Sequence, residues 1–200
     1  MCWRSKAPQP ERPGSANESK GMLEPQNCCL VIVDVQGKLA QLMHDRQVLF
    51  ENLVILAKAA RILDVPVLWC QQCPEALGPT ISELAELLTD NQPINKSSFS
   101  CCGEPEFVDR LQHLPGRELL LCGIEAHVCI YQTAVELVQR GRQVSVIADA
   151  VSSRTARNKE IALEAMRTEG VKLSSTEMAL FELLGSAEHP KFKQIAKLVK

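Results

Sequence analysis

Three residues of this sequence have side chains that together could carry out nucleophilic catalysis: Asp34, Lys96 and Cys129. Cys129 lies near the predicted start of a helix, where free backbone N–H groups and the helix dipole favour a thiolate over a thiol. A carboxylate can remove the thiol proton and later return it, and a nearby lysine keeps that carboxylate ionised. The three residue types therefore predict a cysteine nucleophile with an acid/base partner.

Each of the three residues also has a plainer interpretation. An aspartate at a strand end is usually a cap or a turn former, a lysine in a loop is usually solvated, and a cysteine at a helix start usually packs in the core. Spacing alone therefore leaves the triad a hypothesis. The elements that would bring the three side chains together have to be identified first.

Short apolar segments alternate with amphipathic helical segments, which predicts an α/β domain with a parallel sheet and helices on both faces. In such sheets ligands bind beyond the carboxyl ends of the strands. Asp34, Lys96 and the turn at 123–129 each follow a predicted strand. The six strands are expected at residues 29–33, 65–69, 93–96, 118–122, 144–148 and 171–173.

Capping residues predict where several helices begin. Asp45 can cap a helix that reaches Leu63, and capping boxes are predicted for Thr80 with Glu83 and for Ser174 with Glu177. A further helix starts near Cys129 and is stopped by Gly141. Three more are expected over residues 105–114, 158–169 and 192–200.

Composition limits the class of protein. The 200 residues are 46% hydrophobic, as in a soluble globular domain, and residues 1–26, rich in Pro, Ser, Gly, Glu and Lys, predict a disordered N-terminal tail before a domain at 27–200. A net charge of −2 and 4% aromatic residues give no reason to expect nucleic acid or a membrane as partner.

The odd count of nine cysteines predicts free thiols in a reducing, cytoplasmic compartment. Cys70 and Cys73 have metal or redox spacing but lack a second pair.

Four segments carry a family resemblance: LVIVDVQ (30–36), the lysine of INKSSFS (94–100), GIEAHVCIYQTAVELVQRG (123–141) and VIADAVSSR (146–154). In these segments the chain resembles the isochorismatase-like cysteine hydrolases, a superfamily that includes nicotinamidases, N-carbamoylsarcosine amidase and isochorismatase. LGPTISEL (77–84) and the C-terminal segment are most similar to its isochorismatase-domain-containing subgroup. The resemblance implies a three-layer, Rossmann-like fold whose six-stranded parallel sheet has the order 3-2-1-4-5-6, and a homo-oligomer.

The resemblance also implies roles for individual residues. Cys129 would be the nucleophile, Asp34 the acid/base and Lys96 the charge that supports both. A cis peptide bond would join Ile124 to Glu125, and the amides of Glu125 and Cys129 would form an oxyanion hole. Residues that flank strand ends on the same side are candidates for the walls of the substrate pocket: Gln36, Trp69, Gln71 and Phe99.

Two departures narrow the expected chemistry. Nicotinamidases carry an Asp-x-His-x-His metal site, but segment 69–84 contains no histidine, so we expect no metal and no cofactor and disfavour nicotinamide. Isochorismatases proper use the aspartate without a nucleophilic cysteine, so Cys129 disfavours isochorismate. Glu125 stands where many relatives have a smaller residue, and if its side chain points into the pocket it would repel anionic substrates.

The expected function is that of a metal-free cysteine hydrolase, which cleaves a C–N bond of a small amide or related carbonyl compound through a thioester. The alternative is a non-catalytic ligand-binding or interaction protein on the same fold. A nucleotide-binding Rossmann protein is disfavoured, because only one glycine follows the first predicted strand, in DVQGKLAQ.

Overall fold

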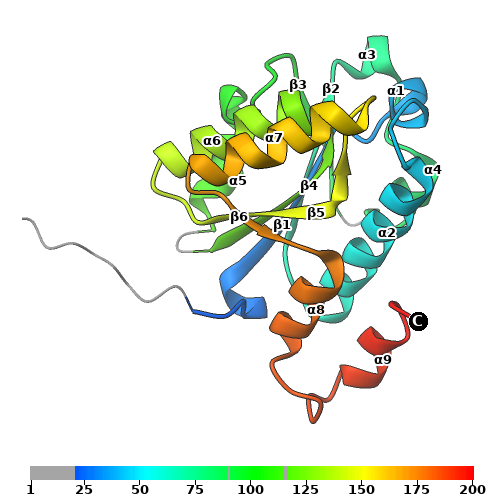
Figure 1. Ribbon diagram of the computed structural model, residues 1–200, viewed down its shortest axis with the longest axis vertical. Helices are drawn as coiled ribbons and strands as arrows, with labels where there is room; N and C mark the ends of the chain where they lie inside the picture. The colour runs from blue at the N-terminus through cyan, green and yellow to red at the C-terminus, as the bar shows by residue number, and fades with distance from the viewer. Residues whose placement is uncertain (1–20, 90, 115–116) are drawn as a thin grey trace, which may run out of the picture.

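The computed structural model describes residues 21–89, 91–114 and 117–200. Its centre is a six-stranded, all-parallel sheet with the order β3-β2-β1-β4-β5-β6, which confirms the predicted topology (Figure 1). Strand order reverses between β1 and β4, and this switch point is where ligands bind in such sheets. The strands are β1 (Cys28–Val33), β2 (Val67–Gln72), β3 (Ile94–Lys96), β4 (Glu118–Ile124), β5 (Val144–Ser152) and β6 (Lys172–Ser174).

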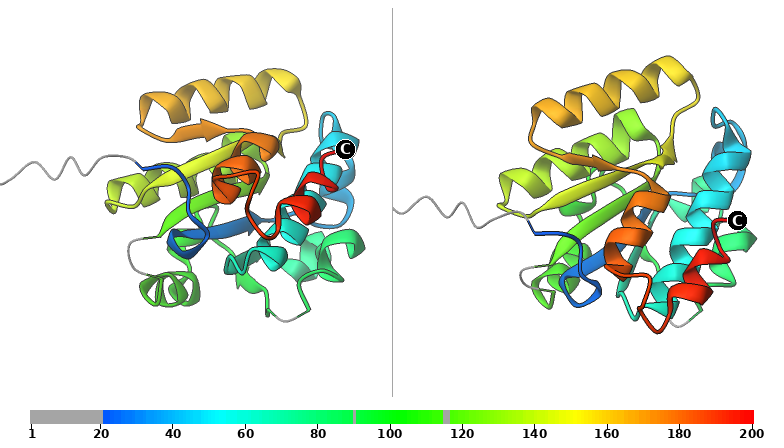
Figure 2. Two further views of the ribbon diagram at one scale, coloured as in Figure 1. Left: turned by 90° about the horizontal axis from the view of Figure 1, so that it is seen from below. Right: turned by 60° about the horizontal axis from the view of Figure 1, so that its bottom comes forward.

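Helices cover both faces of the sheet, as Figures 1 and 2 show. One face carries α2 (Arg46–Ile62), α4 (Ser82–Ala85), α8 (Thr176–Leu184) and α9 (Phe192–Ala196), and the other carries α5 (Pro105–Gln112), α6 (Tyr131–Gln139) and α7 (Ala156–Thr168). Two short helices, α1 (Gly37–Gln41) and α3 (Pro74–Leu77), follow the carboxyl ends of β1 and β2.

Strand side chains alternate between the two apolar cores. Leu30, Ile32 and Trp69 pack on the α2 side, whereas Val31 and Val33 pack on the α6 side. Because successive residues of a strand point to opposite faces, this alternation also decides which polar residues at the strand ends can meet.

All six strands differ from their predicted bounds by at least one residue, and β2 and β5 differ most. β2 starts at Val67 instead of Val65 and continues to Gln72. Pro66, which has no N–H, still joins the ladder through its carbonyl, which accepts a hydrogen bond from Leu30 N at 2.9 Å. β5 runs on to Ser152, because its pairing with β4 shifts register after Leu121 and then resumes.

The predicted caps are wrong in detail. Asp45 precedes α2 in a left-handed backbone conformation, and its side chain contacts His44 at 3.0 Å instead of capping the helix. Thr80 lies in an antiparallel bridge with Gln36, outside α4, so it forms no capping box. Ser175, one residue after the predicted cap, accepts from Met178 N at the start of α8.

The predicted disordered tail falls largely outside the described residues, which begin at 21. Leu23, within that predicted tail, contacts the domain: it is 5% exposed, and its backbone N–H donates to Glu182 of α8 at 3.4 Å. Within residues 21–89, 91–114 and 117–200, no helix has the length and apolar character needed to cross a membrane.

Candidate active site

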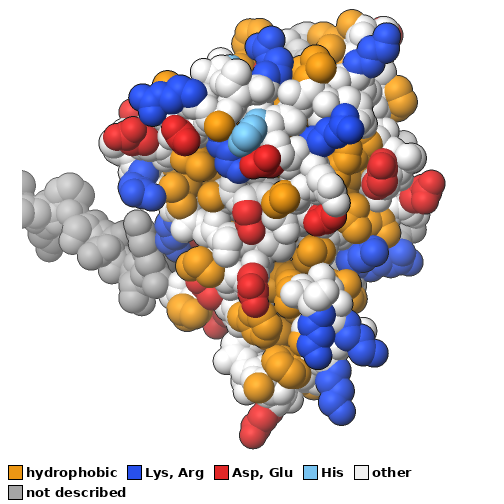
Figure 3. All heavy atoms as spheres, turned by 45° about the vertical axis from the view of Figure 1, so that its right-hand side comes forward, with side chains coloured by type: hydrophobic (Ala, Val, Ile, Leu, Met, Phe, Trp, Pro, Cys, Tyr) orange, Lys and Arg blue, Asp and Glu red, His pale blue; other side chains and the backbone are white. Residues whose placement is uncertain are grey.

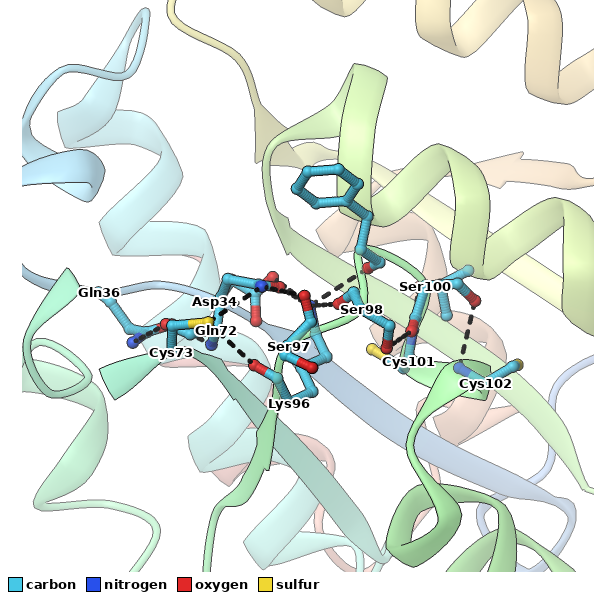
Figure 4. Close-up of polar contacts among 12 residues, drawn as sticks. Asp34, Gln36, Gln72, Cys73, Lys96, Ser97, Ser98, Ser100, Cys101 and Cys102 are labelled. Carbon is cyan, nitrogen blue, oxygen red and sulfur yellow. Dashed lines mark hydrogen bonds and ion pairs between the residues drawn. The ribbon is translucent and has the colours of Figure 1, made fainter. Parts of the chain in front are cut away.

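The structure brings Asp34 and Lys96 into direct contact at the carboxyl edge of the sheet (Figure 4). Asp34 follows β1, and Lys96 is the last residue of β3. Lys96 Nζ lies 2.7 Å from Asp34 Oδ2, and the two side chains are 0% and 2% exposed. An ion pair so completely buried needs further hydrogen bonds to offset the loss of hydration.

Lys96 finds those hydrogen bonds in neutral oxygen atoms. Nζ also donates to Gln72 Oε1 at 2.6 Å, to Ser98 O at 3.1 Å and to Phe99 O at 3.2 Å. Burial by itself lowers the pKa of Lys96, but Asp34 and the thiols of Cys101 and Cys129 outweigh it, and the net shift is upward. Lys96 is therefore a fixed positive charge rather than a proton donor.

Asp34 has the character of a general base. Its backbone takes the left-handed conformation, with φ of 55°, and its N–H donates to Cys70 O at 3.0 Å. Burial raises the pKa of Asp34, while Lys96 and the Cys129 thiol oppose the rise. Oδ1 is buried and, among the described residues, has no partner in hydrogen-bonding geometry. One carboxylate oxygen is thus held by Lys96 and the other is open.

Cys129 lies in a π-helix, η3 (Ala126–Ile130), between β4 and α6, and is 7% exposed. The pKa of the Cys129 thiol is raised to about 12, mainly by burial; the charge of Asp34 also raises it, and Lys96 acts in the opposite direction. The predicted preference for thiolate is therefore wrong. The thiol is buried beside a carboxylate, and α6 begins only at Tyr131, so the resting residue is protonated and needs a base.

The turn before Cys129 is built on Gly123. This residue has φ of 116°, and a Cβ there would lie 2.1 Å from the carbonyl oxygen of Val33 in β1, so only glycine fits. One residue further along, the peptide bond between Ile124 and Glu125 is cis, at the position that the resemblance indicates.

The Glu125 side chain is turned toward Arg154, whose backbone N and Nε donate to Glu125 Oε2 at 3.1 Å and 3.2 Å. The negative charge of the Glu125 carboxylate is thus balanced by the guanidinium of Arg154. His127 contacts Ser153 at 2.9 Å and Asn158 at 3.4 Å, so its ring tethers the turn to the segment after β5.

The four expected pocket residues do not line one wall. Trp69 packs in the core on the α2 side of the sheet and donates to Asn91 O at 3.3 Å. Gln71 has the same parity in β2 and therefore faces the same side, away from Lys96. Phe99 is 55% exposed, and it reaches the ion pair only through its carbonyl oxygen.

Gln36 is fully buried and serves the backbone. Its side chain accepts from Gln72 N at 2.6 Å and donates to Gln72 O at 3.1 Å and to Gly78 O at 2.8 Å. Beyond the end of β1, the Gln36 side chain thereby takes the place of a paired strand for the backbone of Gln72 in β2.

Sequence reasoning missed Gln72. In the register of β2 with β3, Gln72 lies directly beside Lys96, two pairs beyond Cys70 and Ile94. The alternation of β2 could have identified it, because Gln72 shares the parity of the core residue Cys70.

Potential metal ligands are not grouped in the described part of the chain: no three His, Cys, Asp or Glu side chains there lie together in a way that could hold an ion. The eight cysteines of that part are all free thiols. The polar groups at the site are therefore those of the ion pair, the thiol and the amides around them.

A family model described as the isochorismatase domain matches residues 28–178. This chain belongs to the isochorismatase family. Isochorismatase domain-containing protein 2 of Rattus norvegicus is 41% identical over 191 residues, which cover 93% of this chain and 87% of that protein. The family match therefore includes the segments that carry Asp34, Lys96 and Cys129.

Solved structures of similar fold agree with this membership. A structure described as MAR1 ribonuclease from Caenorhabditis elegans has a TM-score of 0.84 and 37% identity, with 90% of this chain and 92% of that chain covered. The YcaC gene product from Escherichia coli, described as an octameric hydrolase of unknown specificity, has a TM-score of 0.84 and 19% identity, with 94% and 91% covered. At that identity the YcaC likeness concerns the fold alone.

Proposed function

We propose that this isochorismatase-family protein is a metal-free cysteine hydrolase that cleaves a small amide, or a related carbonyl compound, through a thioester. One observation carries the proposal: a buried Asp34–Lys96 ion pair leaves Asp34 Oδ1 open and lies beside the Cys129 thiol. A base, a thiol and a fixed positive charge in one buried site are the parts that acyl transfer requires.

The first step joins proton transfer to attack. Asp34 takes the Cys129 proton as sulfur bonds to the carbonyl carbon, and the π electrons of the carbonyl move to its oxygen. The backbone N–H groups of Glu125 and Cys129 are the proposed donors to that oxyanion. Because the pKa of Cys129 is raised to about 12, sulfur becomes a nucleophile only as its proton leaves.

The second half of the reaction returns the proton. The tetrahedral intermediate collapses, the C–N bond breaks, and the amine or ammonia leaves with the proton that Asp34 received. Water then attacks the thioester carbon and gives its proton to Asp34. The C–S bond breaks, and Asp34 reprotonates the departing Cys129. Lys96 keeps its charge throughout and stabilises the ionised states of Asp34 and sulfur.

Release of ammonia or amine from a panel of small neutral and anionic amides tests this function. The wild type is compared with Cys129→Ser and with Cys73→Ser, a partly exposed cysteine outside the triad. Turnover that is lost in Cys129→Ser and kept in Cys73→Ser supports the proposal. A chain that binds an amide without turnover would instead be the non-catalytic binding protein on this fold.

RNA is included as a substrate, because the similar C. elegans structure is described as a ribonuclease. The composition of this chain argues against RNA: its net charge is −2 and aromatics are 4%. On the face drawn in Figure 3, basic and acidic side chains are interspersed. We therefore expect no RNA cleavage, and cleavage that disappears in Cys129→Ser would contradict the amide proposal.

We also propose that the protein is a homo-oligomer. Several large apolar side chains are exposed in the isolated chain, and partner subunits would cover such groups. Light scattering after size exclusion measures the mass directly, and a monomer at micromolar concentration would contradict the proposal. In the described part of the chain, the large apolar residues that are exposed are Met22, Leu42, Val48, Phe99, Ile161, Met178 and Phe181.

A further inference from the structure

Lys96 is held in place by more than its ion pair. Its shortest contact, at 2.6 Å, is with the neutral Oε1 of Gln72, and the contact with Asp34 Oδ2 follows at 2.7 Å. Figure 4 shows Gln72 and Asp34 converging on the lysine from two neighbouring strands. The ammonium therefore bridges the ends of β1 and β2 while it belongs to β3.

The orientation of the Gln72 amide is fixed at its other end. Nε2 donates to Ser97 O at 2.8 Å, so Oε1 is the atom presented to Lys96. The Gln72 backbone is fixed as well, since Gln36 contacts both its N–H and its carbonyl. Gln72 thus has no freedom to turn its acceptor away.

The neutral Oε1 of Gln72 affects the charge of Lys96 differently from a second carboxylate. It compensates the buried ammonium for lost hydration, yet leaves its full charge available to Asp34 and to the thiolate that forms at Cys129. Lys96 contacts a single carboxylate oxygen of Asp34, and Oδ1 keeps no hydrogen-bond partner among the described residues.

We infer that Gln72 is a positioning residue that fixes the Lys96 charge on Asp34 Oδ2 and thereby sets the ionisation of Cys129. This inference rests on the proposed function, because it assigns Gln72 a part in the same site. The Gln72 side chain contacts the thiol of Cys73 at 3.6 Å, and its proposed effect on Cys129 is exerted through Lys96.

The test is the pH midpoint of iodoacetamide labelling of Cys129, resolved from the other cysteines by peptide mass spectrometry. It needs no substrate. Lys96 lowers the pKa of Cys129, so Lys96→Met is expected to raise the midpoint. Gln72→Met, which keeps length but loses the acceptor, is expected to raise it less and to slow labelling at pH 8 by about threefold to tenfold, the effect of one net hydrogen bond.

The matched control is Gln71→Met. Gln71 is the preceding residue, also a buried glutamine, but it faces the opposite side of the sheet. We expect it to label like the wild type. Thermal unfolding of the variants separates a labelling effect from loss of the fold. Should Gln72→Met not fold, Gln72→Asn keeps the amide but is one methylene too short to reach Lys96, and it should raise the midpoint in the same direction.

The double variant Gln72→Met/Lys96→Met decides whether Gln72 acts through the lysine. With Lys96 gone, the loss of Gln72 should add no further shift. A wild-type midpoint in Gln72→Met, or an undiminished shift in the double variant, would overturn the inference. If neither Lys96→Met nor Asp34→Asn moves the midpoint, the coupled triad itself is absent, and the proposed function fails together with this inference. If those two variants move it and Gln72→Met does not, only the inference fails.

Discussion

The carboxylate of Asp34 and the ammonium of Lys96 are 2.7 Å apart, and both side chains are buried. They come from opposite sides of β2 in the sheet, β1 on one side and β3 on the other. The pair can therefore form only when three parallel strands are in register, which makes it a property of the folded sheet and not of any local segment.

Removing the charge of Asp34 should make the Cys129 thiol easier to ionise and yet slow turnover. Asp34 raises the pKa of Cys129, so Asp34→Asn should lower the pH midpoint of Cys129 labelling. The same variant loses the base, so kcat/KM on a turned-over amide should fall by about 10²-fold to 10⁴-fold. Peptide-resolved labelling and ammonia release measure the two effects.

Cys28 is the internal control for this experiment. Burial raises its pKa to about 11 at the far end of β1, and its labelling midpoint should not respond to Asp34→Asn. A Cys129 midpoint that stays in place or moves upward would show that the carboxylate and the thiol are not coupled.

Gly123→Ala should be severely destabilising. The new Cβ would lie 2.1 Å from Val33 O, with φ at 116°, so β1 and β4 would have to separate. We expect a loss of more than about 3 kcal/mol in the free energy of unfolding, measured by urea denaturation. Gly141→Ala is the control: its φ is 78° and nothing lies within 4 Å of the added Cβ, so it should cost only about 1–2 kcal/mol. Equal losses in the two variants would contradict the close packing of β4 on β1.

The ion pair of Glu125 with Arg154 should contribute measurably to stability. Arg154→Met removes the Nε contact from a buried carboxylate but leaves the backbone N–H contact, so we expect a loss of about 1–2 kcal/mol in urea denaturation. The exposed pair of Arg157 with Glu160, at 3.4 Å, is the reference, and Arg157→Met should cost less than about 0.5 kcal/mol. The prediction fails if both variants lose the same amount.

Buried thiols should make the fold sensitive to alkali. Burial raises the pKa of Cys29 and of Cys129 from 9.0 to about 12. A pKa raised by folding means that the stability present below about pH 9 is lost as pH rises toward 12, because the unfolded chain ionises first. The slope is up to about 1.4 kcal/mol per pH unit for each thiol.

Urea midpoints at pH 8, 9.5 and 10.5 measure this loss, and Cys29→Ala should flatten the dependence by one thiol's share. A wild-type stability that stays constant up to pH 10.5 would be incompatible with thiols buried in their neutral form.

The alternation of apolar and amphipathic segments was enough to predict the sheet, and Asp34 and Lys96 were found because each directly follows or ends a strand. Cap chemistry was less informative. Thr80 has the residue type of a cap but lies in a bridge with Gln36, a contact between segments that no local pattern indicates.

The site was predicted less completely, because its details depend on the parity of a strand whose bounds were misplaced. With β2 expected to end at Trp69, Gln71 and Gln72 were both placed in a loop, and Gln71 was chosen as the pocket residue. In a strand that reaches Gln72, one of the two glutamines faces Lys96 and the other faces away. The prediction that Cys129 favours the thiolate was wrong for a related reason. Neither the burial of the thiol nor the nearby carboxylate of Asp34 can be inferred from the position of Cys129 before a helix.

In the loop after β3, the backbone and the side chain of Phe99 have different surroundings. Phe99 offers its carbonyl oxygen to Lys96, as does Ser98, while its side chain is 55% exposed. Any amino acid has that carbonyl. The side chain at position 99 can therefore change without disturbing the contact of the backbone carbonyl with Lys96. Family members can thus differ in the exposed side chain at this position while the buried ion pair of Asp34 and Lys96 stays the same.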